Sequence, residues 1–243
     1  MTETRLAEVI VVMFLATVFR TTFGFGEALV GVPLLALIVP VKVAAPIAVL
    51  ASIVIAGFVV LRDWKHIHLR SAGWLILSTL FGLPLGLMLL KFLSENSMKA
   101  LLAVIILMFS GYSLLYPRRF SLNNDRFAWV FGLGAGICGG SYGMNGPPLA
   151  IYGSLRGWSP ERFRATLQGY FLPASILGMC GFGFAGIWTG AVNRLFLWSL
   201  PSIIGGIFVG RYLARQIGEH QFGRYLHFGL IFIAMLLLFQ VIR

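Results

Sequence analysis

Two charged side chains stand inside the first long apolar stretch of the chain, and their types suggest chemistry with an anion and a proton. Arg20 and Glu27 lie seven positions apart, far from both ends of Leu6–Pro40. Ionisable groups in such surroundings are expensive to bury and are usually functional. Arg20 could neutralise an anion, and Glu27 could accept a proton, since desolvation shifts a carboxyl group toward neutral pH. Two structural interpretations are alternatives to these functional roles. In one, Arg20 and Glu27 form an ion pair across a turn, and in the other, the Arg20 side chain extends to the water interface.

Two glycine-rich breaks interrupt apolar sequence, one early in each half of the chain. They read TFGFGEALVGVP from Thr22 and GGSYGMNGPP from Gly139. A broken helix leaves backbone groups without partners, so such breaks in an apolar medium lie within protein or along a polar cavity. Their free N–H groups and helix N-termini suit an oxyanion, although glycines also serve close helix packing. The candidate glycines are Gly24, Gly26 and Gly31 in the first break, and Gly139, Gly140, Gly143 and Gly146 in the second.

Uncharged hydrogen-bonding side chains accompany the second break. Ser141, Tyr142 and Asn145 lie within it, and Gln168 is a polar residue in the apolar stretch that follows. Each could contact an anionic oxygen, but a buried amide such as Gln168 is as often a link between helices. Two prolines, at 147 and 148, suit a first helical turn, where a missing N–H costs little. We therefore predict that a short helix begins here, with its N-terminus facing the break.

The elements that position these residues are membrane helices. Of the 243 residues, 58% are hydrophobic and 11% are charged, and the mean hydropathy is +0.89. This composition is far from that of soluble globular proteins and predicts an all-α, polytopic protein of the inner membrane, with one membrane domain over residues 1–243. Runs long enough to cross about 30 Å of hydrocarbon occur at Val43–Leu61, Ser71–Leu93, Ser97–Tyr116, Arg164–Ala185, Arg194–Leu213 and Phe222–Ile242. The two longer stretches, Leu6–Pro40 and Arg126–Ser154, carry the breaks.

The two halves of the chain resemble each other. We predict one repeat over residues 6–116 and a second over 126–242, each with a broken stretch followed by three transmembrane helices. Paired breaks at corresponding positions of two halves are the best sequence pointer to a transporter's binding site. At one constant offset Gly82 matches Gly206, Gly86 matches Gly210, Glu95 matches Glu219 and Trp64 matches Trp188.

Basic residues predict the path of the broken stretches. If both stretches crossed the membrane, Lys and Arg would divide nine to nine between the two sides. If each stretch turns back as a hairpin of two half-helices, they divide twelve to six, as the positive-inside rule requires. We therefore predict six full crossings, two re-entrant hairpins, inverted repeats and both termini outside. One hairpin and one crossing, giving seven spans, is the mixed alternative.

Several function classes are disfavoured by the residues. The net charge is +11, but the 19 Lys and Arg are spread over connections without a dense tract, so no nucleic-acid partner is expected. We expect neither a cofactor nor a metal, because no Cys or carboxylate cluster completes a site at His66 and His68 beyond Asp63. An enzyme is not expected either. An intramembrane hydrolase with Ser141 as nucleophile would need a base at depth, and the histidines lie in connections or near a span end.

The motifs carry a family resemblance. FGFGEALVGVP, its weaker echo GGSYGMNGPP, the two-fold repeat and the chain length resemble the TauE/SafE family of sulfite and organosulfonate permeases, over nearly the whole chain from Leu6. The resemblance implies a secondary carrier for small anions, often sulfur oxyanions or sulfonates, coupled to a proton gradient. Many members have a run of glycines where this chain has Gly26, Glu27 and Ala28, and the second motif here places Met144 and Asn145 before Gly146. These departures leave the substrate open.

Together these observations predict a secondary transporter of a small anion that works by alternating access, with its central site built from the two breaks. The partners are a small anionic substrate and the lipid bilayer, and a homo-oligomer is compatible with the sequence. An anion channel that uses the same breaks as a filter is the alternative, since both designs place helix N-termini around an aqueous path. The direction of transport and the coupling ion are left open.

Overall fold

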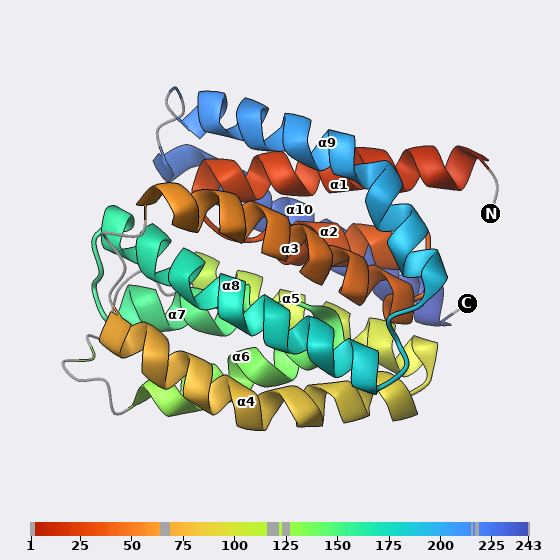
Figure 1. The fold of residues 1–243 in the computed structure, drawn as a ribbon, viewed down its shortest axis with the longest axis horizontal. Helices are drawn as coiled ribbons and strands as arrows, with labels where there is room; N and C mark the ends of the chain where they lie inside the picture. Colours follow the sequence, from red (N-terminus) through yellow and green to blue (C-terminus); the bar gives the residue numbers. More distant parts are fainter. Residues whose placement is uncertain are drawn as a thin grey trace.

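The described chain is a bundle of ten α-helices with no strand (Figure 1). The computed structural model describes residues 3–63, 69–115, 122, 127–214, 216 and 219–242. The predicted all-α, polytopic architecture is thereby confirmed. The helices are α1 (Glu3–Phe23), α2 (Glu27–Ala36), α3 (Val41–Asp63), α4 (Leu69–Phe92), α5 (Glu95–Leu115), α6 (Ala128–Tyr142), α7 (Gly146–Leu155), α8 (Pro160–Phe184), α9 (Gly190–Ala214) and α10 (Glu219–Ile242).

Six helices within the described ranges are long and apolar enough to cross a membrane. Five of them, α3, α4, α5, α8 and α9, match predicted spans. The sixth is α1, which has 21 residues and is a full-length helix rather than the half-helix predicted for this stretch. The last predicted span forms α10. Within the described part of the chain, the apolar segment of this helix is His227–Ile242. The first broken stretch is therefore a long helix followed by a short one.

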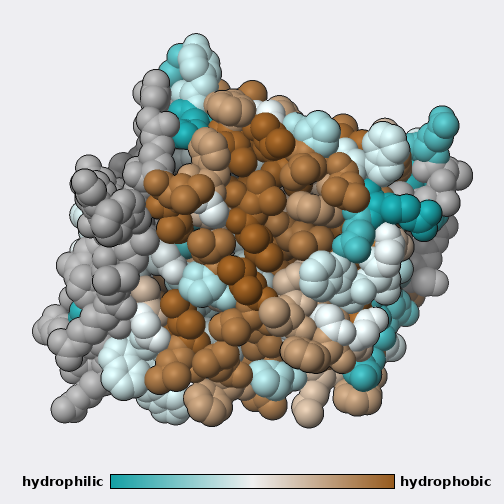
Figure 2. Space-filling model, viewed as in Figure 1, coloured by the Kyte–Doolittle hydropathy of each residue, from teal (hydrophilic) through white to brown (hydrophobic). Residues whose placement is uncertain are grey.

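The surface of the bundle suits a bilayer. Figure 2 shows a broad hydrophobic band across the middle of one face, with hydrophilic residues gathered toward the right of the view. Large apolar side chains exposed on the molecule include Phe81 of α4, Phe208 of α9 and Phe239 of α10. Lipid covers such groups at no cost, which explains why they need no protein partner.

Glycines with left-handed backbone form both breaks. Gly24 and Gly26 have φ values of 86° and 101° between α1 and α2, and Gly143 has a φ of 65° at the end of α6. A residue with a Cβ atom is strained in this region, whereas glycine adopts it freely. Gly143 ends α6 with its N–H donated to the Gly139 carbonyl at 2.8 Å, and Met144 donates to the Cys138 carbonyl at 3.2 Å. These two bonds satisfy two of the carbonyls in the final turns of the helix.

The second half-helix of each break is short. α2 and α7 both have ten residues, against 15 for α6. α7 begins at Gly146 with prolines in its first turn, which confirms the predicted helix start. In Figure 1 the N- and C-termini lie at the same end of the bundle, and α3 and α8 run in opposite directions. The inverted repeat and the re-entrant paths remain predictions that this arrangement fits.

The glycines that match between the two halves lie where a helix of one half packs closely on a helix of the other. α4 packs mainly on α6, and α9 packs mainly on α1 (Figure 1). A Cβ atom on Gly86 would collide with the Ile137 carbonyl oxygen, and one on Gly210 would collide with the Thr21 hydroxyl. Glycine is required at these two positions because the backbones of the two helices lie too close for a side chain, which is the packing role considered from the sequence. Each broken helix is thus held by a helix of the other half.

Several sequence interpretations fall on residues outside the described part of the chain. They concern Trp64, His66 and His68, and many of the basic residues used to predict the topology.

Candidate functional site

Arg20 lies in the last turn of α1 and is fully buried. Its Nη1 atom forms an ion pair with Glu27, the first residue of α2, and donates to the Ser52 hydroxyl at 2.7 Å. Its Nη2 atom donates to Gln168 Oε1 at 2.8 Å. Full burial excludes the reading in which Arg20 extends to the interface. The ion pair across the turn, considered from the sequence, is present.

Arg20 keeps further capacity to bind. Its Nε atom is buried, and within the described structure it has no hydrogen-bond partner. The guanidinium carbon lies 4.8 Å from the centre of the Phe171 ring, at cation–π distance. Buried donors without partners are rare in folded proteins and mark sites that bind water, an ion or a ligand.

Gln168 of α8 joins this cluster to the first break. Its Nε2 atom donates to the Gly24 carbonyl oxygen at 2.6 Å, while its Oε1 atom accepts from Arg20. Gln168 therefore links two helices, which is one of the two roles considered for it from the sequence. Ser175, also on α8, donates to Ser52 of α3 at 2.9 Å. The cluster thus ties α1, the first break, α3 and α8 together.

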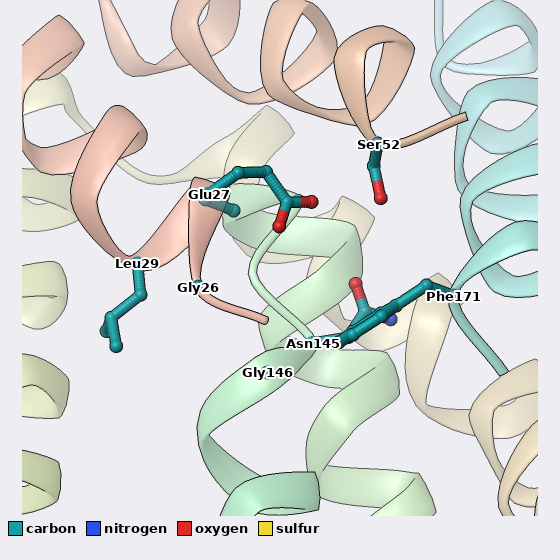
Figure 3. A pocket seen from close by; sticks show the side chains of 9 residues that line it. Gly26, Glu27, Leu29, Ser52, Asn145, Gly146 and Phe171 are labelled. Carbon is teal, nitrogen blue, oxygen red and sulfur yellow. The ribbon is translucent and has the colours of Figure 1, made fainter. Parts of the chain in front are cut away.

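The two breaks share one small pocket (Figure 3). In Figure 3 the polar ends of Glu27, Ser52 and Asn145 face the same space, and Leu29 points away from it. The space that the centre of a water molecule can occupy is about 10 Å³, room for one water. The lining residues are Gly26, Glu27, Ala28 and Leu29 of the first break, Gly143, Asn145 and Gly146 of the second, and Ser52 and Phe171.

Helix N-termini add positive potential to this pocket. α2 begins at Glu27 and α7 begins at Gly146, and both residues line the pocket. Unpaired N–H groups in the first turn of a helix attract anions. Two helix starts therefore border a single space, the Arg20 guanidinium contacts residues that line it, and Glu27 supplies a compensating negative charge.

Asn145 is held by a hydrogen-bond network behind the pocket. Its Nδ2 atom donates to the Tyr170 hydroxyl at 3.1 Å, and that hydroxyl lies 2.6 Å from Thr79 Oγ1. Thr79 of α4 also donates to the Gly132 carbonyl of α6 at 3.0 Å. All three side chains are buried. This network orients the Asn145 amide toward the pocket.

Two predicted site residues, Ser141 and Tyr142, belong neither to the pocket lining nor to the hydrogen-bonded cluster around Arg20. Ser141 donates to the Ile137 carbonyl at 2.7 Å, within its own helix, and Tyr142 donates to the Met98 carbonyl of α5 at 2.9 Å. Both hydroxyls stabilise helices. The remaining predicted residues fall into two groups. Those that line the pocket are Gly26, Glu27, Gly143, Asn145 and Gly146. Arg20 bonds to the lining residues Glu27 and Ser52, and Gln168 bonds to Arg20 and to Gly24.

Sequence reasoning missed Ser52 and Phe171. Both lie within uninterrupted apolar helices, where one small hydroxyl or one aromatic ring carries no signal of its own. Ser52 is a polar residue in the first predicted span, which could have raised the same question as Gln168. Among the described residues, no group of three His, Cys, Asp or Glu side chains could hold a metal ion.

Comparisons with known proteins cover nearly the whole chain. A family model described as "Sulfite exporter TauE/SafE" matches residues 9–238. A protein of Cupriavidus necator named "Probable sulfite/organosulfonate exporter TauE" is 23% identical over 201 residues, which are 80% of this chain and 78% of that protein. No solved structure gives a significant match.

Proposed function

The chain belongs to the sulfite exporter family TauE/SafE, and we propose that it carries a small sulfur-containing oxyanion or organosulfonate across the inner membrane by alternating access. Membership makes it a multi-pass membrane transporter of sulfur anions. The relative's printed name supports sulfite and organosulfonates as the substrate class. Substrate choice and mechanism rest on the site.

The observation that carries the proposal is the buried guanidinium beside a pocket shared by both breaks. Arg20 is fully buried, and three of its contacts, Glu27, Ser52 and Phe171, line the pocket. A sulfonate presents three oxygens in a compact group, which matches several convergent N–H donors. The proposed ligands are Arg20, the N–H groups at the start of α2, the Gly146 N–H at the start of α7, and the Asn145 amide.

Glu27 is the proposed proton-coupling residue. It is the one acidic side chain among the residues that line the pocket, and it contacts Arg20 directly. A carboxylate in this position changes the charge of the site when it takes up a proton. Transport is then sensitive to a pH gradient.

The crosswise packing of the halves supports alternating access. Each broken helix is held by a helix of the other half, α1 by α9 and α6 by α4. Rocking of one pair against the other would open the central pocket to either side while the Arg20 cluster stays at the centre. A channel with the same pocket would show flux that neither saturates nor responds to a pH gradient.

Ligand-induced thermal stabilisation of the purified protein tests the substrate class. We expect sulfite or an organosulfonate to raise the melting temperature, because a ligand that binds only the folded state stabilises it. The panel is sulfite, sulfate, thiosulfate, sulfoacetate, taurine and short carboxylates. Arg20→Gln should abolish the shift, whereas Arg194→Gln, which removes the same charge from an exposed position, should keep it. An unchanged response in Arg20→Gln would remove Arg20 from the site.

A further inference from the structure

The ion pair between Arg20 and Glu27 occupies the position that a substrate anion needs. Arg20 is fully buried, and its Nη atoms are already engaged by Glu27, Ser52 and Gln168. The adjoining pocket has room for about one water molecule. The Arg20 Nε atom still has an N–H that is free within the described structure, but an anion bound there would lie beside the ionised Glu27 carboxylate, so the two negative groups would compete for one guanidinium.

Charge balance decides what happens to the displaced carboxylate. Arg20 and Glu27 together carry no net charge. If an anion replaced an ionised Glu27, two negative charges would share one guanidinium in a buried site, and one of them would lack a partner. Buried charges without partners are strongly unfavourable. Protonation of Glu27 removes this cost.

The surroundings of Glu27 supply no second compensating charge among the contacts of the described residues. α1 contributes Arg20 and α3 contributes Ser52. The second break contributes Asn145, whose amide is bonded to Tyr170 of α8. The sequence of α7 contains no charged residue.

On the two other helices packed on α2, the described charged and titratable side chains are engaged elsewhere, among them Lys99 of α5, which donates to Gln240 of α10 at 3.0 Å. On α5, Glu95 accepts from the Val41 N–H at the start of α3 at 2.9 Å. On α10, the His227 ring packs edge-to-face against Phe109 of α5. Arg20 and Glu27 are thus the charged pair of this site.

From this geometry we infer that the site takes up one proton with each monoanion that it binds, because the anion and the Glu27 carboxylate compete for Arg20. This inference rests on the proposed function. The proton is added to a Glu27 carboxyl oxygen, the Arg20 N–H donors pass from Glu27 to the anion, and the net charge of the site is zero before and after.

Two properties follow from this exchange. The site selects monoanions, such as a monosulfonate or hydrogen sulfite, over dianions, which leave one negative charge unpaired. Proton and anion also move together as a neutral set, so a membrane potential does no work on the loaded carrier. The proton and anion gradients alone then determine the direction of net transport.

Calorimetric titration with methanesulfonate tests the inference, because this anion is singly charged at all working pH values. The titration is run in Tris and in imidazole, which carry no sulfonate group, and the difference in heat gives the number of protons bound. We expect about one proton per anion, and an affinity that falls about tenfold per pH unit where free Glu27 is ionised. Methanedisulfonate should bind much more weakly.

Matched variants locate the proton. Glu27→Gln should bind methanesulfonate with no proton uptake and with an affinity independent of pH. It should also lose thermal stability without the anion and regain it with the anion, since Arg20 then lacks its partner. Glu95→Gln removes another carboxylate that accepts a backbone N–H and should keep the wild-type proton count.

The outcomes separate the inference from the proposed function. Binding of methanesulfonate by the wild-type protein without proton uptake would overturn the competition between anion and Glu27, while transport of sulfur anions would stand. Proton uptake that persists in Glu27→Gln would also overturn it. Absence of binding by every sulfur anion tested would overturn the function and the inference together. The wild-type proton count decides the question even if a variant does not fold.

Discussion

The Gln168 side chain donates a hydrogen bond of 2.6 Å to the carbonyl oxygen of Gly24, the first residue after α1. The same amide accepts from Arg20 at 2.8 Å. A residue of α8 in the second half therefore holds both the broken backbone and the buried cation of the first half. This one side chain connects the site to the interface between the halves.

Loss of the Gln168 amide should weaken both folding and anion binding. Gln168→Leu leaves the Gly24 carbonyl without its donor and Arg20 without one acceptor, which costs about 1–3 kcal/mol of stability. Chemical unfolding in detergent and methanesulfonate affinity are the measurements. Gln240→Leu removes an amide that accepts from Lys99 at the exposed end of α10 and should change neither quantity measurably. Equal effects of the two substitutions would contradict a special role of Gln168.

The Arg20–Glu27 pair should behave as a unit in a double-mutant cycle. Arg20→Gln leaves a buried carboxylate unpaired and should cost about 3–5 kcal/mol of unfolding free energy at neutral pH. The double variant Arg20→Gln/Glu27→Gln has no buried charge and should recover most of this loss without recovering anion binding. Unfolding of all four proteins is the measurement. Additive effects would show that the two charges act independently.

Glycines at the crosswise contacts should tolerate no side chain. Gly86→Ala and Gly210→Ala place a methyl group against the Ile137 carbonyl and the Thr21 hydroxyl, and forced separation of packed helices costs about 1–3 kcal/mol. Gly73→Ala on α4 and Gly111→Ala on α5 have open space around the added methyl and should be neutral. Thermal unfolding compares the four. Stable Gly86→Ala protein would contradict the close contact of α4 with α6.

Two buried tyrosines should separate site function from structure. Tyr170→Phe removes the acceptor of the Asn145 amide and should lower both stability and anion affinity. Tyr142→Phe removes a hydrogen bond to the Met98 carbonyl, away from the pocket lining, and should lower stability alone. Each lost bond costs about 1 kcal/mol in the unfolding free energy. Unchanged affinity in Tyr170→Phe would exclude a positioning role for that hydroxyl.

Labelling from one side of the membrane should reveal the path of the first broken stretch. Exposed Glu8 precedes the first break and exposed Lys42 follows α2, so a hairpin places both on the same side. Leu61, near the other end of α3, should lie opposite. Single cysteines at these positions, in a chain without Cys138 and Cys180, are treated with an impermeant maleimide. Opposite labelling of Glu8→Cys and Lys42→Cys would show a full crossing.

Local sequence was sufficient to recognise the membrane helices, the helix breaks and the buried ionisable pair. Hydropathy identifies a span of about 20 apolar residues, and a charged residue within such a span is easily recognised. The prolines at 147 and 148 likewise announced the start of α7. The length of α1 was misjudged because the break at Gly24 follows a complete helix, and local composition does not say how deep a break lies.

Tertiary structure alone decided which residues meet at the site. Arg20 and Gln168 are 148 positions apart. Phe171 follows Gln168 on α8, and Ser52 comes from a further helix, α3, that reads as a plain apolar span. In water, a polar face tells which side of a helix is exposed, but in lipid both faces of a helix are apolar and the periodic signal is lost. Which glycines face another helix, and which small polar side chains face the pocket, therefore emerges only when the helices are packed together.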